Sequence, residues 1–97
     1  MSATTSRQVP LAERPSATQI EALLQARFEP VRLAVIDESQ QHAGHAGAAE
    51  GSHMRVEICS TAFAGLSRVA RHRLVYDALS AQIRRGIHAL AIIAEVP

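Results

Sequence analysis

The chain has 97 residues, of which 47% are hydrophobic and 20% are charged, and its formal net charge at pH 7 is +1. This length predicts one small domain, and the composition is that of a globular protein and not of a disordered one. A multidomain enzyme is excluded, and so small a net charge gives no support for nucleic-acid binding through bulk electrostatics.

The cysteine count and the apolar runs indicate the compartment. Cys59 is the single cysteine, so an internal disulfide is impossible and a reducing environment is expected. No apolar run approaches the ~20 residues of a membrane span. Residues 1–14 lack the apolar stretch of a secretory signal. We therefore expect a cytoplasmic protein that does not associate with membranes.

The first part of the chain predicts a tail, a helix and a strand. Residues 1–15 are polar and punctuated by proline, which predicts a flexible tail ahead of a domain over residues 16–97. Ser16 and Gln19 have capping-box spacing, and apolar residues at helical spacing follow up to Phe28, which predicts a helix over about 16–28. The β-rich segment 31–36 predicts a strand.

The middle of the chain predicts a long hairpin. Residues 40–52, QQHAGHAGAAEGS, are small and polar without periodicity, which predicts a loop. From His53 onward, apolar and polar residues alternate, so the second strand has one covered face and one wetter face. Cys59 shares the parity of the wetter face, and we expect its thiol to be reachable from solvent.

The last third predicts two helices and a strand. After the turn-like segment 61–65, apolar stripes at helical spacing run from Leu66 to Ala70 and from Leu74 to Ile83, and Gly86 follows. The polar step at residues 71–73 is the expected joint between the two helices. Residues 87–96 are apolar on both parities, which predicts a strand buried on both faces.

The element order defines the fold class. Helix, strand, strand, helix, helix, strand (α-β-β-α-α-β) places a hairpin first and a helical crossover second. A hairpin pairs its strands antiparallel, whereas a helical crossover favours a parallel, right-handed connection. The prediction is an α+β domain in which a three-stranded mixed sheet carries its helices on one face.

Four ordered segments resemble the BolA family over about residues 16–96. They are VRLAVIDES in the first strand, HAGHAG with SHMRV across the hairpin, FAGLSRVARHRLVYDAL through the helices, and IHALAI in the last strand. The resemblance implies a fold similar to a type II KH domain. Residues 61–65 lack the GXXG loop with which KH domains clamp nucleic acid, so RNA binding of that kind is not implied.

The resemblance also implies a function. BolA-like proteins partner monothiol glutaredoxins and take part in iron–sulfur cluster trafficking and iron regulation. The implied role is a non-enzymatic adaptor that shares a [2Fe-2S] cluster which the isolated chain does not hold tightly. One implied ligand is the last-strand histidine, His88, and the other is a loop histidine, either His42 or His45. Imidazole suits iron, and replacing thiolate by histidine raises the potential of a two-iron cluster.

Other interpretations of the same residues stay open. His88 could be an ordinary strand residue that is hydrogen-bonded at the surface, and His42 and His45 could be solvated loop residues without a role. A zinc site could combine the loop HxxH with His53 and Cys59. An enzyme could use Cys59 as a nucleophile with His53 or His72 as its base. No oxyanion turn and no paired carboxylates accompany these residues, so we do not expect an enzyme.

The segment Arg68, Arg71, His72 and Arg73 is basic, with no acid before Asp77. Such a segment is either a solvated helix surface or a surface that recognises an acidic protein or phosphate. Some BolA-like proteins are described as DNA-binding regulators that use this region, so the resemblance implies DNA binding as the alternative function. We expect a monomer or a weak homodimer.

Overall fold

The computed structural model describes residues 15–39 and 52–97 of the chain. All of the predicted tail except Pro15 lies outside the described residues. So do residues 40–51 of the predicted loop, with His42 and His45 among them.

The first helix, α1, spans Ala17–Phe28 and confirms the capping prediction. The Ser16 hydroxyl accepts a hydrogen bond from the Gln19 amide at 3.1 Å, and the Gln19 side chain accepts one from the Ser16 amide at 3.0 Å. These two bonds satisfy main-chain donors that the first turn leaves without helical partners. The helix ends at Glu29, which adopts the left-handed conformation with φ 45°, immediately before Pro30.

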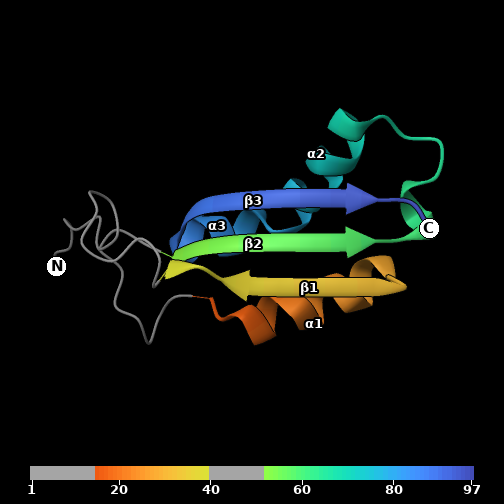
Figure 1. The fold of residues 1–97 in the computed structure, drawn as a ribbon. Helices are drawn as coiled ribbons and strands as arrows, with labels where there is room; N and C mark the ends of the chain where they lie inside the picture. The colour runs from red at the N-terminus through yellow and green to blue at the C-terminus, as the bar shows by residue number, and fades with distance from the viewer. Residues whose placement is uncertain (1–14, 40–51) are drawn as a thin grey trace, which may run out of the picture.

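Three strands form the predicted mixed sheet in the order β1-β2-β3. They are β1 (Arg32–Asp37), β2 (Ser52–Cys59) and β3 (Ile87–Glu95). β1 pairs with β2 antiparallel and β2 pairs with β3 parallel. Within the described residues, the helices lie on one face of this sheet (Figure 1). The predicted fold class is confirmed.

The second and third helices divide at a different place from the predicted one. α2 spans Arg68–Ala78, α3 spans Ser80–Gly86, and the break falls at Leu79. The expected joint at residues 71–73 is wrong because these polar side chains lie within α2 and need no interruption of the helix. Leu79 is fully buried, so the chain bends where it anchors a side chain in the core.

The core lies between the sheet and the helices. Phe63, in the short 3-10 helix η4 (Thr61–Phe63), is fully buried and contacts Phe28, with ring centroids 5.2 Å apart. The alternation predicted for β2 is confirmed from His53 to Ile58, and Cys59 departs from it because it is buried. The buried cluster comprises Ile20, Leu24, Phe28, Met54, Val56, Ile58, Phe63, Val75, Leu79 and Ile87.

The prediction that the last strand is buried on both faces is wrong. Leu90, Ile92 and Ala94 pack against the core, whereas Ala89 and Ile93 are exposed. Apolar residues of both parities mark a doubly covered strand only where layers lie on both sides. Here the helices occupy one face, and the residues of the other parity, Ala89, Ala91, Ile93 and Glu95, are exposed.

Ser60 links α1 to η4 through two hydrogen bonds. Its hydroxyl donates to the Phe28 carbonyl at 2.6 Å and accepts from the Ala62 amide at 3.0 Å, and the residue is fully buried. Replacing Ser60 by alanine leaves both main-chain groups without this partner, so we expect the free energy of unfolding to fall by about 1–3 kcal/mol in urea denaturation.

The matched control for Ser60→Ala is Ser67→Ala. Ser67 caps α2 by accepting from the Ala70 amide at 3.1 Å, but at an exposed position. Water can replace that bond, so the loss should be about 0.5–1 kcal/mol. Equal losses for the two variants would contradict the structural role assigned to the buried hydroxyl.

Candidate functional site

His88 lies at the start of β3, where the pairing with β2 is irregular. The register passes from Ser52 opposite Ile87 to His53 opposite Ala89, so His88 is an extra residue in the ladder. His88 and Ala89 are consecutively exposed, whereas Ile87 is buried. A bulge of this kind turns a side chain out of the regular alternation. The bulge thereby places His88 on the surface of the domain.

His53 is the neighbour of His88 across the bulge. The two imidazole ring centroids are 5.4 Å apart, and the planes are inclined by 54°. His53 is held by its main chain, because its amide donates to the Ser39 hydroxyl at 3.0 Å and its carbonyl accepts from the Glu38 amide at 2.7 Å. Two histidines 35 positions apart in the sequence are therefore neighbours.

An ion pair lies next to His53. The Arg55 Nε donates to the Glu38 carboxylate at 3.0 Å, and Glu57 is a second, weaker partner at 3.9 Å. The hydrogen bond and the negative charge of Glu38 raise the pKa of Arg55 above its ordinary value. This guanidinium stays charged, and it keeps the Glu38 carboxylate committed to an ion pair.

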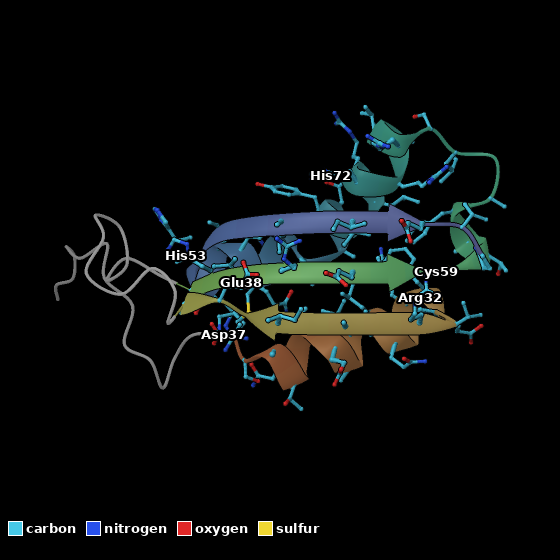
Figure 2. The ribbon with its side chains drawn as sticks, in the orientation of Figure 1. Arg32, Asp37, Glu38, His53, Cys59 and His72 are labelled. Atoms are coloured by element: carbon cyan, nitrogen blue, oxygen red, sulfur yellow. The ribbon has the colours of Figure 1, made fainter. Side chains whose placement is uncertain are left out.

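Cys59 lies at the other end of β2 from His53 (Figure 2). At roughly 3.3 Å per residue, the two positions are about 20 Å apart and cannot bind one metal ion. The zinc interpretation that combines them is wrong. Among residues 15–39 and 52–97, no three histidine, cysteine, aspartate or glutamate side chains gather as potential metal ligands.

The expectation that the Cys59 thiol is reachable is also wrong, because Cys59 is only 3% exposed. Its cross-strand neighbours are Arg32 in β1 and Glu95 in β3, and these two form an ion pair at 3.6 Å. The pair bridges the central strand at the level of Cys59. A nucleophile so covered does not support the enzyme interpretation.

The basic segment is divided between structural and exposed residues. Arg71 donates from Nε to the Leu66 carbonyl at 3.0 Å and from an Nη atom to the Ala94 carbonyl at 3.3 Å. It is half-buried, whereas Arg68 and Arg73 are exposed. Arg71 thus joins the start of α2 to β3, and the other two arginines are available to a partner.

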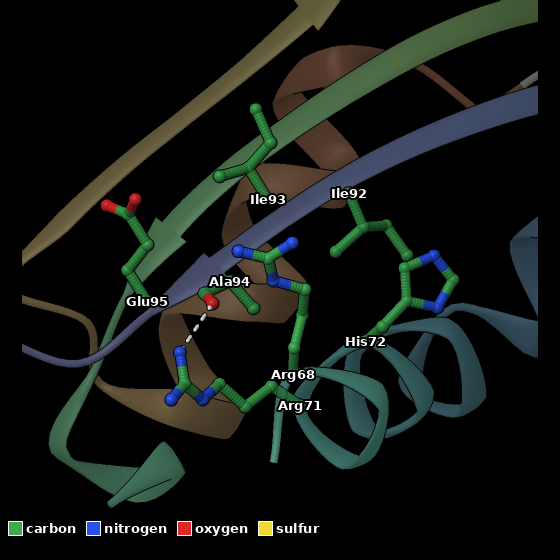
Figure 3. Close-up of a pocket in the computed structure, with 7 residues that line it drawn as sticks. All are labelled: Arg68, Arg71, His72, Ile92, Ile93, Ala94 and Glu95. Atoms are coloured by element: carbon green, nitrogen blue, oxygen red, sulfur yellow. Dashed lines mark hydrogen bonds between the residues drawn. The ribbon is translucent and has the colours of Figure 1, made fainter. Parts of the chain in front are cut away.

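Arg68, Arg71 and His72 face a groove of about 400 Å³ between α2 and the end of β3 (Figure 3). On the opposite wall are Ile92, Ile93, Ala94 and Glu95. His72 is exposed and stacks on Tyr76, with ring centroids 6.3 Å apart. Three nitrogen-bearing side chains against one carboxylate make this groove suited to an anionic group.

None of the described helices is long and apolar enough to cross a membrane. A family model described as BolA-like protein matches residues 24–97. An uncharacterized protein from Sinorhizobium, in the cobS 5' region, is 52% identical over 81 residues, which cover 80% of this chain and 87% of the relative.

A solved structure of BolA1 from Arabidopsis thaliana is also similar. Its TM-score is 0.74 at 42% identity, and the match covers 84% of this chain and 92% of that structure. The chain spans about half, 53%, of the full-length chloroplastic protein BOLA1 from that plant. The DNA-binding transcriptional regulator BolA of Escherichia coli is 40% identical over 74 residues, which cover 76% of this chain and 69% of the regulator.

Proposed function

This chain belongs to the BolA-like protein family, and we propose that it is a non-enzymatic adaptor that binds a monothiol glutaredoxin and shares a [2Fe-2S] cluster with it. The observation that carries this proposal is the exposed His88, which a bulge turns outward at the edge of the sheet. Imidazole is a good ligand for iron. The proposed setting is the reducing cytoplasm, where thiolates of the partner stay available.

The position of His88 supports a shared cluster. Ser39 accepts a hydrogen bond from the His53 amide, and the His53 ring lies beside the His88 ring. In the sequence, His42 and His45 follow Ser39 and precede His53. A chain that offers only imidazoles leaves the thiolate positions to a partner, and the cluster then bridges the two proteins.

The adaptor proposal is tested by reconstitution. The chain is mixed with a monothiol glutaredoxin, glutathione, ferrous iron and sulfide under anaerobic conditions, and the complex is isolated by gel filtration. We expect a heteromeric complex whose visible absorption and circular dichroism differ from those of the glutaredoxin cluster alone. An unchanged spectrum together with separate elution of the two proteins would contradict the proposal.

A second candidate function is DNA binding through the basic surface of α2. It is favoured by the name of the Escherichia coli relative, a DNA-binding transcriptional regulator, and by the exposed Arg68 and Arg73. Because Arg71 is committed to the Leu66 and Ala94 carbonyls, two or three phosphate contacts are the most that the segment supports. Binding by one domain is then weak and strongly dependent on salt.

Fluorescence anisotropy with a labelled duplex tests this second function. With two or three neutralised phosphates, the affinity should fall roughly 10-fold to 40-fold between 50 and 200 mM salt. Arg68→Ala and Arg73→Ala should each weaken binding and lower that salt dependence. Arg84→Ala, at an exposed basic position of α3, is the matched control. If the duplex does not bind at 50 mM salt, or if Arg84→Ala weakens binding as much as the other two variants do, the basic surface of α2 is not a DNA-binding surface.

A further inference from the structure

We propose that the groove between α2 and β3 binds an extended acidic segment of a partner protein, which adds as a further strand along the outer edge of β3. The groove adjoins residues 92–95, whereas His88 lies at the other end of this strand. At roughly 3.3 Å per residue, His88 is about 13 Å from Ile92 and about 23 Å from Glu95. A segment bound in the groove does not reach His88, so this function is separate from the proposed cluster sharing.

The outer edge of β3 offers main-chain groups to such a segment. Among the described residues, β3 pairs with β2 on one side and with no strand on the other. The Glu95 carbonyl accepts from the amide of Ser60, the residue that follows β2, so the main-chain groups of Glu95 point toward β2. Successive residues of a strand direct these groups to opposite edges. Those of Ile92 and Ala94 therefore point outward, as a template for another chain.

Arg71 fixes the position of the opposite wall. Its Nη atom reaches the outward carbonyl of Ala94 at 3.3 Å (Figure 3), and its Nε donates to the Leu66 carbonyl at 3.0 Å. These bonds tie the start of α2 to β3 and occupy one acceptor of the edge. The outward N–H and C=O of Ile92 have no strand beside them in the described part of the chain. Because the groove exists before a partner binds, little free energy is lost in forming it.

The charges of the groove favour an acidic segment. Arg68 and His72 are exposed on the α2 wall, and Glu95 is the one carboxylate among the described residues that line the groove. Glu95 itself is paired with Arg32 at 3.6 Å. A carboxylate placed beside Ile92 faces the Arg68 guanidinium, whose parallel N–H groups match the two oxygens of a carboxylate.

A peptide is a better occupant of this groove than a nucleic acid. The outward carbonyl of Ile92 needs a hydrogen-bond donor. Every peptide N–H supplies one, whereas the phosphodiester backbone offers only acceptors. Ile93, which is 41% exposed, adds apolar surface for side chains of the added strand. In strand addition, main-chain hydrogen bonds give affinity and the side-chain contacts give specificity.

The first experiment uses the full chain without iron or glutaredoxin. The probe is a fluorescein-labelled peptide of alternating threonine and valine with one central aspartate, and its binding is followed by anisotropy. Arg68→Ala should weaken binding roughly 10-fold, because a hydrogen bond between charged groups is lost, and asparagine in place of the aspartate should weaken it similarly. Arg84→Ala, at an exposed position of α3, is the matched control and should bind as the parent does.

A second peptide tests strand addition itself. N-methylation of the two amides that flank the aspartate keeps its charge but removes the donors that pair with the edge, so this peptide should not bind. If it binds as tightly as the unmodified peptide, or if Arg68→Ala leaves the affinity unchanged, the proposal is overturned.

The second experiment locates the bound peptide by amide nuclear magnetic resonance. The outward amides of Ile92 and Ala94 should shift and exchange more slowly with solvent when the peptide binds, whereas the amide of Ile93, which points toward β2, should change little. A DNA duplex that shifts these amides when the peptide does not would make the groove a nucleic-acid surface. Protection of these amides that disappears on dilution of the chain alone would assign the edge to a second copy. Either result overturns the proposal, and neither measurement depends on whether a cluster forms.

Discussion

Replacing His88 by alanine is expected to remove most of the visible circular dichroism that the shared cluster gains from this chain. The cluster would lose an imidazole ligand that water cannot replace with comparable affinity, and it would return to the glutaredoxin or decompose. The fold should persist, because His88 is exposed and the neighbouring Ile87 supplies the core contact. The measurements are visible circular dichroism of the reconstituted complex and far-ultraviolet circular dichroism of the chain alone.

Two further variants define the role of His88 more closely. His88→Cys offers a thiolate at the same place, so the cluster should reassemble with a lower reduction potential, because histidine ligands raise the potential relative to thiolates. His72→Ala removes another exposed imidazole, on α2, and should leave the spectrum unchanged. A His88→Ala complex with the spectrum and cluster lifetime of the parent would exclude His88 as a ligand.

The parts of the fold that were predictable depend on local patterns. The α1 boundaries follow from Ser16, Gln19 and Pro30, which act within one turn of the helix. The hairpin and the parallel crossover follow from the order of the elements and the handedness of such connections. The break between α2 and α3 was misplaced because the pattern between residues 66 and 83 does not show which apolar residue, Leu79, reaches the core.

The candidate site depends on contacts between distant parts of the chain. His88 was identified through its segment, but its contact with His53 requires the β2–β3 register and the position of the bulge. Neither is encoded in periodicity. A His at the start of each of two predicted neighbouring strands was the available signal, and a one-residue change in register would have separated them.

Contacts between distant segments also explain why the prediction for Cys59 is wrong and why Arg71 differs from its basic neighbours. Strand parity predicts Cys59 on the wetter face, but Cys59 is buried between its register neighbours Arg32 and Glu95, which form an ion pair although they are 63 positions apart. The sequence groups Arg71 with its basic neighbours, whereas its guanidinium donates hydrogen bonds to the main-chain carbonyls of Leu66 and Ala94. Charge patterns predict where arginines cluster, and tertiary contacts decide which of them a partner can reach.

The largest expected effect on stability is that of Phe63→Ala. Phe63 is fully buried, and its ring packs on Phe28 beneath the turn between β2 and α2. Removing a buried phenyl group leaves a cavity and costs about 3–5 kcal/mol, against the 5–15 kcal/mol total typical of a folded protein. The urea midpoint should therefore fall sharply, and the variant should be partly unfolded at 37 °C.

The control for Phe63→Ala is Val69→Ala, which also truncates an apolar side chain but at a position that is 70% exposed in α2. Its effect should stay within about 0.5 kcal/mol. The short helix η4 links the end of β2 to α2. The loss of Phe63 should therefore also disturb the position of α2, and with it the groove that Arg68 and His72 line. If Phe63→Ala unfolds within 1 kcal/mol of the parent, the phenyl ring does not hold these elements together, and the core would have to be centred on the contacts of α1 with the sheet.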